Sequence, residues 1–421
     1  MFAPPLDRME TYSAMGSLYL RGLYHHHIKL DTSQRVPLFS ILGFDLMRTV
    51  TSIKHKMTYA PFSKYLKLIA GLCSFGLIVV ATINYTVNPG KIYPPLLISD
   101  SYNKLSPKQI VKQLVQSDHG IIVKNDTWNE RDLKHALALR PTTAQCAVIG
   151  SSRIMQISSV RKERLLSDNC PSLINLGVSG ASLEDYLALS ETILRNEKPP
   201  KVIVFGIDPW SLNFDRDSRW VRYKQNFFHM KSKLEGEYHD DNSSSTLALM
   251  RNLISREYLL RSLQLILSER LSIENVQEFD HRLGLDDPVL LPDGSLIYSG
   301  KHIRSTLASK ISGVHEFRIR GTRWVTEKAV ELFTRLVNHL QQQKFKIIFV
   351  LVPYHPAVWD ITEQSAVTAM KVVESKVHEI ARLTGTQVIG SYNPSNIGCT
   401  ADEFFDAVHG KTICLTKLER A

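Results

Sequence analysis

The residue types best suited to covalent chemistry are a serine at the end of an apolar run and an Asp-His pair near the C-terminus. Ser152 follows the run from Cys146 to Gly150, and Asp406 and His409 are three residues apart in FFDAVH. A serine hydroxyl becomes a nucleophile when a histidine takes its proton and a carboxylate orients that histidine. On one helical turn, this spacing places Asp406 and His409 on the same face, which predicts such an orientation. Taken alone, each motif has a simpler explanation, a common Gly-Ser-Ser turn or a surface ion pair on the last helix.

Five short apolar runs predict the strands that would position these residues. Their continuous Val and Ile content is typical of parallel strands that are covered on both faces. Amphipathic patterns at residues 183–196 and 326–343 predict helices between them. The expected fold class is therefore α/β, a three-layer sandwich with a mostly parallel five-stranded sheet. The five runs are Ala144–Gly150, Ser172–Val178, Lys201–Asp208, Lys346–Pro353 and Thr386–Tyr392.

Polar loop residues follow the first three runs, at the edge where parallel strands present their carboxyl ends and bind ligands. The first run leads into GSSR at residues 150–153, and the second leads into NLGVSGAS, which contains Gly180. The third leads into GIDPWSLN, which contains Asp208 and Asn213. Glycines at this edge can expose backbone N–H groups to a ligand, although SGAS could also simply cap the following helix.

The strand-tip serine, the glycine turn and the late Asp-x-x-His, in this order, resemble the SGNH/GDSL hydrolase family over about residues 144–415. The GSSR form, combined with an N-terminal anchor, looks most like the membrane-tethered branch that includes alginate O-acetylation proteins and DltD-like proteins. The resemblance implies that Ser152 is the nucleophile, that His409 is the general base and that Asp406 orients it. It also implies that the backbone N–H groups of Ser152 and Gly180 stabilise the oxyanion.

The same resemblance implies a flavodoxin-like strand arrangement and acyl-ester chemistry, either hydrolysis or O-acyl transfer. The expected substrates are O-acyl groups on glycans or glycolipids of the cell envelope. No cofactor and no metal are expected.

One position departs from the family pattern, because Asp208 stands where the family has an oxyanion-stabilising asparagine. An ionised carboxylate there would repel the developing oxyanion and could cost several kcal/mol of transition-state stabilisation. Either Asp208 is held protonated, or another group such as Asn213 substitutes for it, or the site is weak. The alternative function is therefore a catalytically degenerate SGNH scaffold that serves as a glycan-binding or assembly module of the envelope.

Three further residues near the predicted edge have two interpretations each. Ser151 is either a reactive or a structural hydroxyl, and Arg153 either anchors the turn or binds an anionic substrate. His355, in VPYHP after the fourth run, could line the same cleft or pack within its loop.

The run from Leu68 to Val87 contains 20 residues without a charge. At about 1.5 Å per residue, this length crosses the roughly 30 Å hydrocarbon layer of a bilayer. A buried core helix and a cleaved signal peptide are the competing interpretations. We expect a single transmembrane helix at residues 65–88. Four lysines precede the run, which predicts a cytoplasmic N-terminus with the rest exported. The family resemblance implies that the membrane is the inner membrane of a bacterium and that the exported part is periplasmic or extracellular.

The expected organisation is a cytoplasmic, poorly ordered extension at residues 1–60, the bilayer-spanning helix, a linker and lead-in to the exported domain at 89–143, and an SGNH-like domain at 144–421. Within that domain, residues 210–322 lack a βαβ pattern and are interpreted as an insertion, which contains the hairpin-like LLPDGSLIY. Four cysteines outside the apolar run permit two disulfides in three connectivities, and their spacing argues against a zinc site. About half of the net charge of +10 lies before the apolar run, where residues 1–67 contain nine Lys/Arg against four Asp/Glu; this clustering favours a basic flank near a membrane over a nucleic-acid partner.

Overall fold

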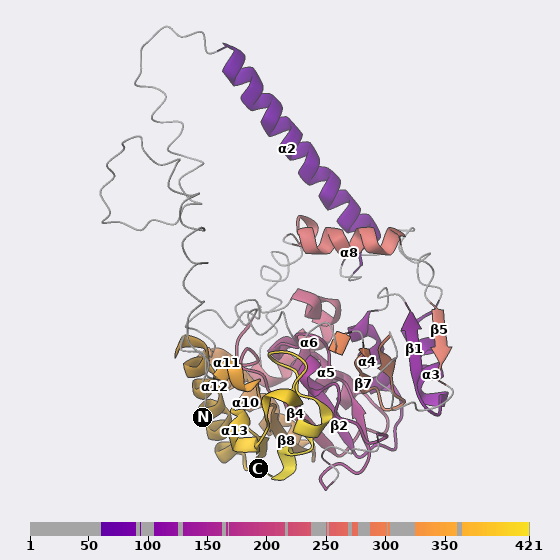
Figure 1. Cartoon of the computed structure of the whole chain (residues 1–421), viewed down its shortest axis with the longest axis vertical. Helices are drawn as coiled ribbons and strands as arrows, with labels where there is room; N and C mark the ends of the chain where they lie inside the picture. Colours follow the sequence, from indigo (N-terminus) through magenta and orange to yellow (C-terminus); the bar gives the residue numbers. More distant parts are fainter. Residues whose placement is uncertain are drawn as a thin grey trace, which may run out of the picture. The chain divides into compact units, whose positions relative to one another are not determined.

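The computed structural model describes most of the chain from Ala60 onward and divides it into two compact units, Met1–Gly71 and Leu72–Ala421. The expected extension at residues 1–60 lies outside the described residues, apart from Ala60 itself. In the first unit, the described residues are the first turns of helix α2, and the second unit contains both sheets (Figure 1). The described residues are 60–89, 93, 105–124, 129–161, 166, 168–214, 218–236, 250, 252–267, 272–276, 287–300, 302–303, 325–359 and 364–420.

Helix α2 runs from Ala60 to Val87, where the sequence predicts a membrane span. Its segment Ser63–Val87, 25 residues, is long and apolar enough to cross a membrane. Large apolar side chains project from it without cover, as for Leu72 and Phe75, which are 62% and 66% exposed. A core helix of a soluble domain would bury such side chains, so the competing core-helix interpretation does not fit.

The five predicted apolar runs form one parallel sheet in the order β3-β2-β4-β8-β9. Gly150 is aligned with Gly206, and Gly206 with Val350, so the carboxyl ends of the three central strands lie level. The chain passes from β2 outward to β3 and then returns past β2 to β4, which makes the gap between β2 and β4 the point where the strand order reverses. The strands are β2 Cys146–Gly150, β3 Leu173–Asn175, β4 Val202–Gly206, β8 Lys346–Leu351 and β9 Gln387–Gly390.

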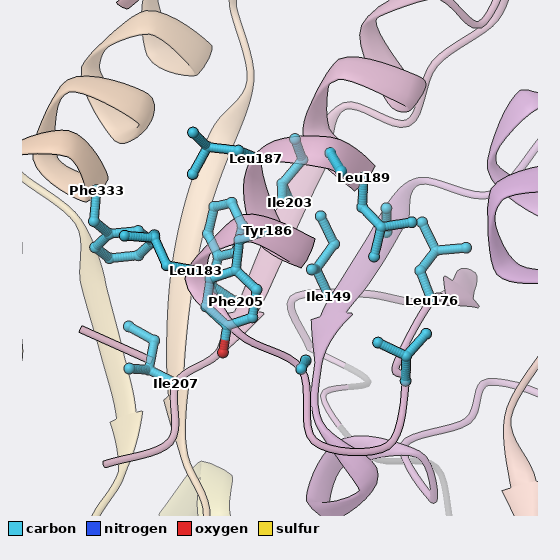
Figure 2. Packing of buried hydrophobic residues seen from close by; sticks show 14 of the residues in the cluster. Ile149, Leu176, Leu183, Tyr186, Leu187, Leu189, Ile203, Phe205, Ile207 and Phe333 are labelled. Carbon is cyan, nitrogen blue, oxygen red and sulfur yellow. The ribbon is translucent and has the colours of Figure 1, made fainter. Parts of the chain in front are cut away.

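Alternate strand residues enter two separate hydrophobic clusters, so both faces of the sheet are buried. Ile149, Ile203 and Phe205 belong to the cluster that receives α5 and α10, and Figure 2 shows Tyr186 of α5 and Phe333 of α10 among them. Short turns and two disulfides supply the second cluster in the described part of the chain, so a third layer of long helices stays a prediction. The helices that contribute to the first cluster are α3 Pro107–Gln116, α4 Glu130–Leu139, α5 Leu183–Leu194, α6 Lys224–Glu235, α10 Glu327–Gln342 and α12 Gln364–Thr384.

A second, antiparallel sheet has the order β5-β1-β6-β7 and was not predicted as a sheet. It combines a strand that precedes the parallel sheet with strands from the predicted insertion. LLPDGSLIY forms the hairpin β6-β7, as its Asp-Gly turn predicts, and Gly294 takes the left-handed conformation at φ +83°. The strands are β1 Ile121–Lys124, β5 Ser272–Asn275, β6 Val289–Leu290 and β7 Leu296–Ile297.

The four cysteines outside α2 form two disulfides, Cys146–Cys170 and Cys399–Cys414. The first joins β2 to the connection that leads to β3, and the second closes a loop after β9. Of the three connectivities that the sequence allows, the structure therefore selects the one that pairs neighbours along the chain. Cys73, in α2, is the remaining cysteine and is free and exposed.

Candidate active site

Ser152, His409 and Asp406 form a continuous hydrogen-bonded relay. The Ser152 Oγ lies 2.9 Å from the His409 Nε2, although the two residues are 257 positions apart in the sequence. The His409 Nδ1 lies 2.7 Å from the Asp406 Oδ2. Because a carboxylate only accepts hydrogen bonds, the Nδ1 carries the proton and the Nε2 lone pair accepts the Ser152 O–H. This is the arrangement in which a histidine can remove a serine proton.

Ser152 lies at the carboxyl end of β2 because the chain folds there into a tight 3-10 turn, η2, from Ser152 to Ile154. The Ser151 Oγ accepts the Arg153 N–H at 3.2 Å, and Ser151 is fully buried, so its hydroxyl is structural. The turn also requires glycine beside it: a Cβ on Gly206 would lie 2.3 Å from the Ile154 Cγ2, and one on Gly150 would lie 2.8 Å from the Ile154 Cγ1. Glycines at the ends of β2 and β4 therefore make room for Ile154, which lets the serine turn fold against the sheet.

Asp406 and His409 lie in an irregular loop, and the expectation that they share a helical turn is wrong. The loop is closed by an isolated bridge between Phe404 and Gly410 and follows the short turn η5, Ala401–Glu403. The Asp406 Oδ1 accepts the N–H groups of Val408 and His409 at 2.8 and 2.7 Å, which bends the loop back on itself. The Asp-x-x-His spacing thus brings the two side chains together through a side-chain-to-backbone turn.

The environment of Asp406 favours its ionised form. Burial by itself raises the pKa of this carboxyl, but the hydrogen bond and charge of His409 and the two backbone N–H donors lower it further, so the net pKa is below its usual range. The His409 ring is also stacked on Phe405 at a centroid distance of 5.7 Å and an interplanar angle of 5°. An ionised carboxylate and a flat aromatic neighbour together hold the imidazole in one orientation.

Arg153 anchors the serine turn, so the alternative in which it binds an anionic substrate does not fit its contacts. Its side chain is 1% exposed, and its Nη1 donates to the Asp208 Oδ1 at 2.9 Å. Its Nε donates to the Val408 carbonyl at 3.0 Å, and its Nη2 donates to the carbonyl oxygens of Val352 and Pro353. The guanidinium therefore joins the serine turn, the histidine loop and the ends of β4 and β8.

Asp208 is the counter-ion of this buried guanidinium. Burial raises the pKa of Asp208 above its usual range, while the charge of Arg153 and hydrogen bonds from Ser151 and Arg153 oppose the shift. The guanidinium cannot lose its proton, and a buried cation without a counter-charge is costly, so we treat the pair as ionised. The Oδ2 of Asp208 is buried and has no hydrogen-bond partner among the described residues. A carboxylate at this position thus has a packing and charge-balancing explanation that the sequence pattern did not offer.

Two backbone donors lie at the places where the sequence predicts an oxyanion site. The Ser152 N–H begins the turn η2, and within the described residues it donates to no acceptor. Gly180 takes the left-handed conformation at φ +62°, and its N–H likewise has no acceptor within the described part of the chain. Each of the two strand-end loops thus contains a backbone N–H group without an acceptor in the described part of the chain.

The Gly180 loop is held rigidly by residues that sequence analysis did not single out. The Ser179 N–H donates to the Glu130 Oε2 at 2.6 Å, and the Arg219 Nη2 donates to the Ser179 carbonyl at 2.7 Å. Arg131 pairs with Asp185 through two hydrogen bonds of 2.7 and 2.8 Å, both side chains being buried. Asp185 also accepts the N–H of Ser182, which caps α5 as the simpler interpretation of SGAS predicts.

Among the described residues, no hydrogen bond joins Asn213 or His355 to Ser152. The Asn213 Oδ1 accepts the N–H of Phe214, further along the loop that follows β4. The His355 Nδ1 accepts the N–H of Ala357 at 3.0 Å, and the His355 N–H donates to the Ala407 carbonyl at 3.1 Å. His355 is buried, and its backbone bond to Ala407 holds it against the Asp406–His409 loop, in agreement with the packing interpretation.

Tyr298, which sequence analysis missed, contacts both ends of the Ser152–His409 pair. Its hydroxyl donates to the Ser152 carbonyl at 2.9 Å, and its ring lies 5.7 Å from the His409 ring and 5.1 Å from that of Phe405. It follows the hairpin β6-β7, so the predicted insertion contributes directly to the site. LLPDGSLIY was visible as a hairpin, but nothing local in the sequence indicates that its tyrosine reaches a serine 146 positions away.

The one group with metal-ligating geometry among the described residues is Cys399, Glu403 and Cys414. The two sulfur atoms form a disulfide, and Glu403 is paired with Lys417 at 2.6 Å. This group therefore braces the loop that carries Asp406 and His409.

No protein-family model and no curated protein matches the chain. The interpretation of the site consequently depends on its geometry and on the sequence motifs described above.

Proposed function

We propose that the chain is a membrane-anchored SGNH-type serine esterase or O-acyltransferase that acts on ester groups of cell-envelope glycans or glycolipids. The observation that carries this proposal is the Ser152–His409–Asp406 relay at the carboxyl edge of the parallel sheet. Two distant parts of the chain meet there, Ser152 after β2 and the Asp406–His409 loop after β9, with the donor and acceptor order that nucleophilic catalysis requires. The substrate class is what the resemblance of GSSR, combined with the N-terminal anchor, to the membrane-tethered branch of the family implies.

In the proposed reaction, the Ser152 Oγ attacks the ester carbonyl carbon while the His409 Nε2 takes the hydroxyl proton. The carbonyl oxygen becomes an oxyanion, which the N–H groups of Ser152 and Gly180 stabilise. The bond to the alcohol then breaks, the alcohol leaves with the proton from His409, and the acyl group remains on Ser152. Water or a sugar hydroxyl next attacks the acyl-serine and gives its proton to His409. The bond between the carbonyl carbon and the Ser152 Oγ then breaks, His409 returns the proton to this oxygen, and an acid or a new ester leaves.

We further propose that the fold is a three-layer sandwich of the SGNH or flavodoxin-like type. The reversal of strand order between β2 and β4 supports this assignment, because ligand sites of doubly wound sheets lie at such switch points. Parallel crossovers are right-handed, so the β2-to-β3 connection must cover the face opposite to α5, α10 and α12.

The proposed location is the bacterial inner membrane, with α2 as a single anchor and the catalytic domain outside the cytoplasm. The length and apolar surface of α2 support the anchor. Both disulfides favour an oxidising compartment, because cytoplasmic thiols are kept reduced.

The second candidate is a catalytically degenerate scaffold, which the presence of Asp208 in place of an asparagine favours. Labelling of the full chain with a fluorophosphonate probe separates the two candidates, because the probe reacts only with an activated serine. We expect covalent labelling of the wild type, and loss of labelling in Ser152→Ala and in His409→Ala. Ser395→Ala, which removes an exposed serine elsewhere, is the matched control and should label like the wild type. Wild-type labelling at the level of Ser152→Ala would refute the esterase proposal.

A further inference from the structure

Hydrogen bonds join the C-terminal end of α2 to a second helix, α8, which runs from Arg256 to Leu267. The Asn84 Nδ2 donates to the backbone carbonyls of residues 252, 253 and 255, just before α8, at 3.3, 2.8 and 3.3 Å. The Asn84 Oδ1 accepts the Ser262 hydroxyl at 3.1 Å, and one turn later the Asn88 Oδ1 accepts the Tyr258 hydroxyl at 3.1 Å. Asn84 is fully buried by these contacts, so α8 lies beside the last turn of α2, at the same level along the axis of α2.

This height corresponds to the surface of a bilayer if α2 is the membrane anchor. The apolar segment Ser63–Val87 has 25 residues, and at about 1.5 Å per residue it is longer than the roughly 30 Å hydrocarbon layer. Its last turn, with Asn84, therefore extends into the headgroup region. Three tyrosines cluster there, with ring centroids 5.4 Å apart for Tyr85 and Tyr93 and 6.1 Å apart for Tyr93 and Tyr258. Tyrosine is enriched at this level of membrane proteins.

The side of α8 that faces away from α2 is apolar and uncovered. Leu260, Leu263 and Leu267 follow one another at helical spacing and are 49%, 38% and 83% exposed. Tyr258 and Ser262, which contact α2, lie on the opposite side of the helix. A row of exposed leucines in water would be unfavourable, since each buries apolar surface only when a partner covers it.

We propose that α8 is an interfacial helix whose leucine row inserts into the lipid surface beside α2. Lipid is the occupant that the geometry favours, because the row lies at bilayer-surface height and is continuous with the anchor. Arg256, at an exposed position in the first turn of α8, suits the phosphate groups of anionic lipids. Such a helix would fix the tilt of the domain on the membrane and add a second attachment point. The inference rests on the proposed anchor but not on the proposed esterase chemistry.

Depth-dependent quenching of a fluorophore tests this inference on the full chain in vesicles of phosphatidylethanolamine and phosphatidylglycerol. The label is an environment-sensitive maleimide dye, and its native attachment point is Cys73, the free cysteine of α2. In a Cys73→Ser background, the dye is placed at Leu263→Cys and at Leu267→Cys. The matched control is Leu383→Cys, an equally apolar residue on α12 that is 64% exposed. Each sample is titrated with aqueous iodide and, separately, with doxyl-labelled lipid.

We expect lipid-borne doxyl to quench the dye at positions 73, 263 and 267 and iodide to quench it at position 383. Quenching by doxyl at position 73 but by iodide at positions 263 and 267 would overturn the inference and leave the anchor standing. Protection from both quenchers at positions 263 and 267 would indicate cover by a second copy of the chain and would also overturn it. Iodide quenching at all four positions would instead refute the anchor itself.

Discussion

Asp208→Asn is the substitution that best distinguishes a misplaced oxyanion residue from a buried counter-ion. It installs the residue that the SGNH family pattern has at this position. If the charge of Asp208 opposed the oxyanion, the asparagine would raise the rate of ester hydrolysis. Because Asp208 instead balances Arg153, which is 2% exposed, we expect the substitution to destabilise the fold without raising the rate.

The magnitude follows from the contacts that remain to the guanidinium. Removing one partner of a buried ion pair typically costs about 3–5 kcal/mol. Arg153 keeps hydrogen bonds to three backbone carbonyls and lies 3.8 Å over the ring of Tyr354, and asparagine retains one acceptor. These contacts place the cost at the lower end, about 3 kcal/mol. At about 2–4 °C per kcal/mol for a domain of this order of size, the Tm should fall by about 6–12 °C.

The assay is thermal unfolding of the full chain in detergent, followed by near-ultraviolet circular dichroism and paired with hydrolysis of p-nitrophenyl acetate per folded molecule. The double variant Arg153→Met/Asp208→Leu removes both charges and should be less destabilised than Asp208→Leu alone, since no unpaired cation remains. An unchanged Tm combined with faster hydrolysis in Asp208→Asn would refute the counter-ion assignment.

Three further predictions concern the surroundings of the relay. Gly206→Ala should lower the free energy of unfolding by about 1–3 kcal/mol, because the added Cβ would clash with Ile154. The double variant Gly206→Ala/Ile154→Ala should lose less Tm than the sum of the two single variants, because the shorter side chain removes the clash. Additive losses of Tm would contradict this contact. Replacement of both Cys399 and Cys414 by serine should cost about 3 kcal/mol of unfolding free energy. It should also reduce fluorophosphonate labelling, because the disulfide closes the loop that carries His409. Labelling at the wild-type level would show that the loop keeps its position without the disulfide. Tyr298→Phe should slow hydrolysis by no more than about tenfold, the equivalent of one hydrogen bond. Tyr298→Ala should slow it more, because it also removes the ring that lies beside His409 and Phe405. Equal losses of rate in the two variants would exclude a separate contribution of the ring.

Local sequence patterns were sufficient to predict the parallel sheet, and the family resemblance of the strand-end motifs predicted the residues of the relay. Each strand of that sheet is a continuous Val- and Ile-rich run, and this signal is local because both faces of the strand are buried. The order of strand-end motifs then placed Ser152 and His409 at one edge, where their side chains lie 2.9 Å apart. Apart from the hairpin β6-β7, which its Asp-Gly turn predicts, the antiparallel sheet gave no comparable signal, since β1 and β5 have four residues each and come from distant segments.

The remaining features depend on contacts between residues that are far apart in the chain, and tertiary structure alone decided them. Asp208 was conspicuous in the sequence as a departure from the family pattern, but its partnership with Arg153 depends on how the ends of β2 and β4 meet. The Asp406–His409 pair was expected on a helix and lies in a loop, because side-chain hydrogen bonds to the backbone give the same three-residue contact. Cysteine pairing, too, is a matter of spatial proximity, which spacing does not encode. The sequence by itself thus indicated the strands, through local periodicity, and the candidate serine, histidine and aspartate, through their motifs and the family that they resemble. Long-range packing decided which neighbours orient, charge-balance and enclose these residues.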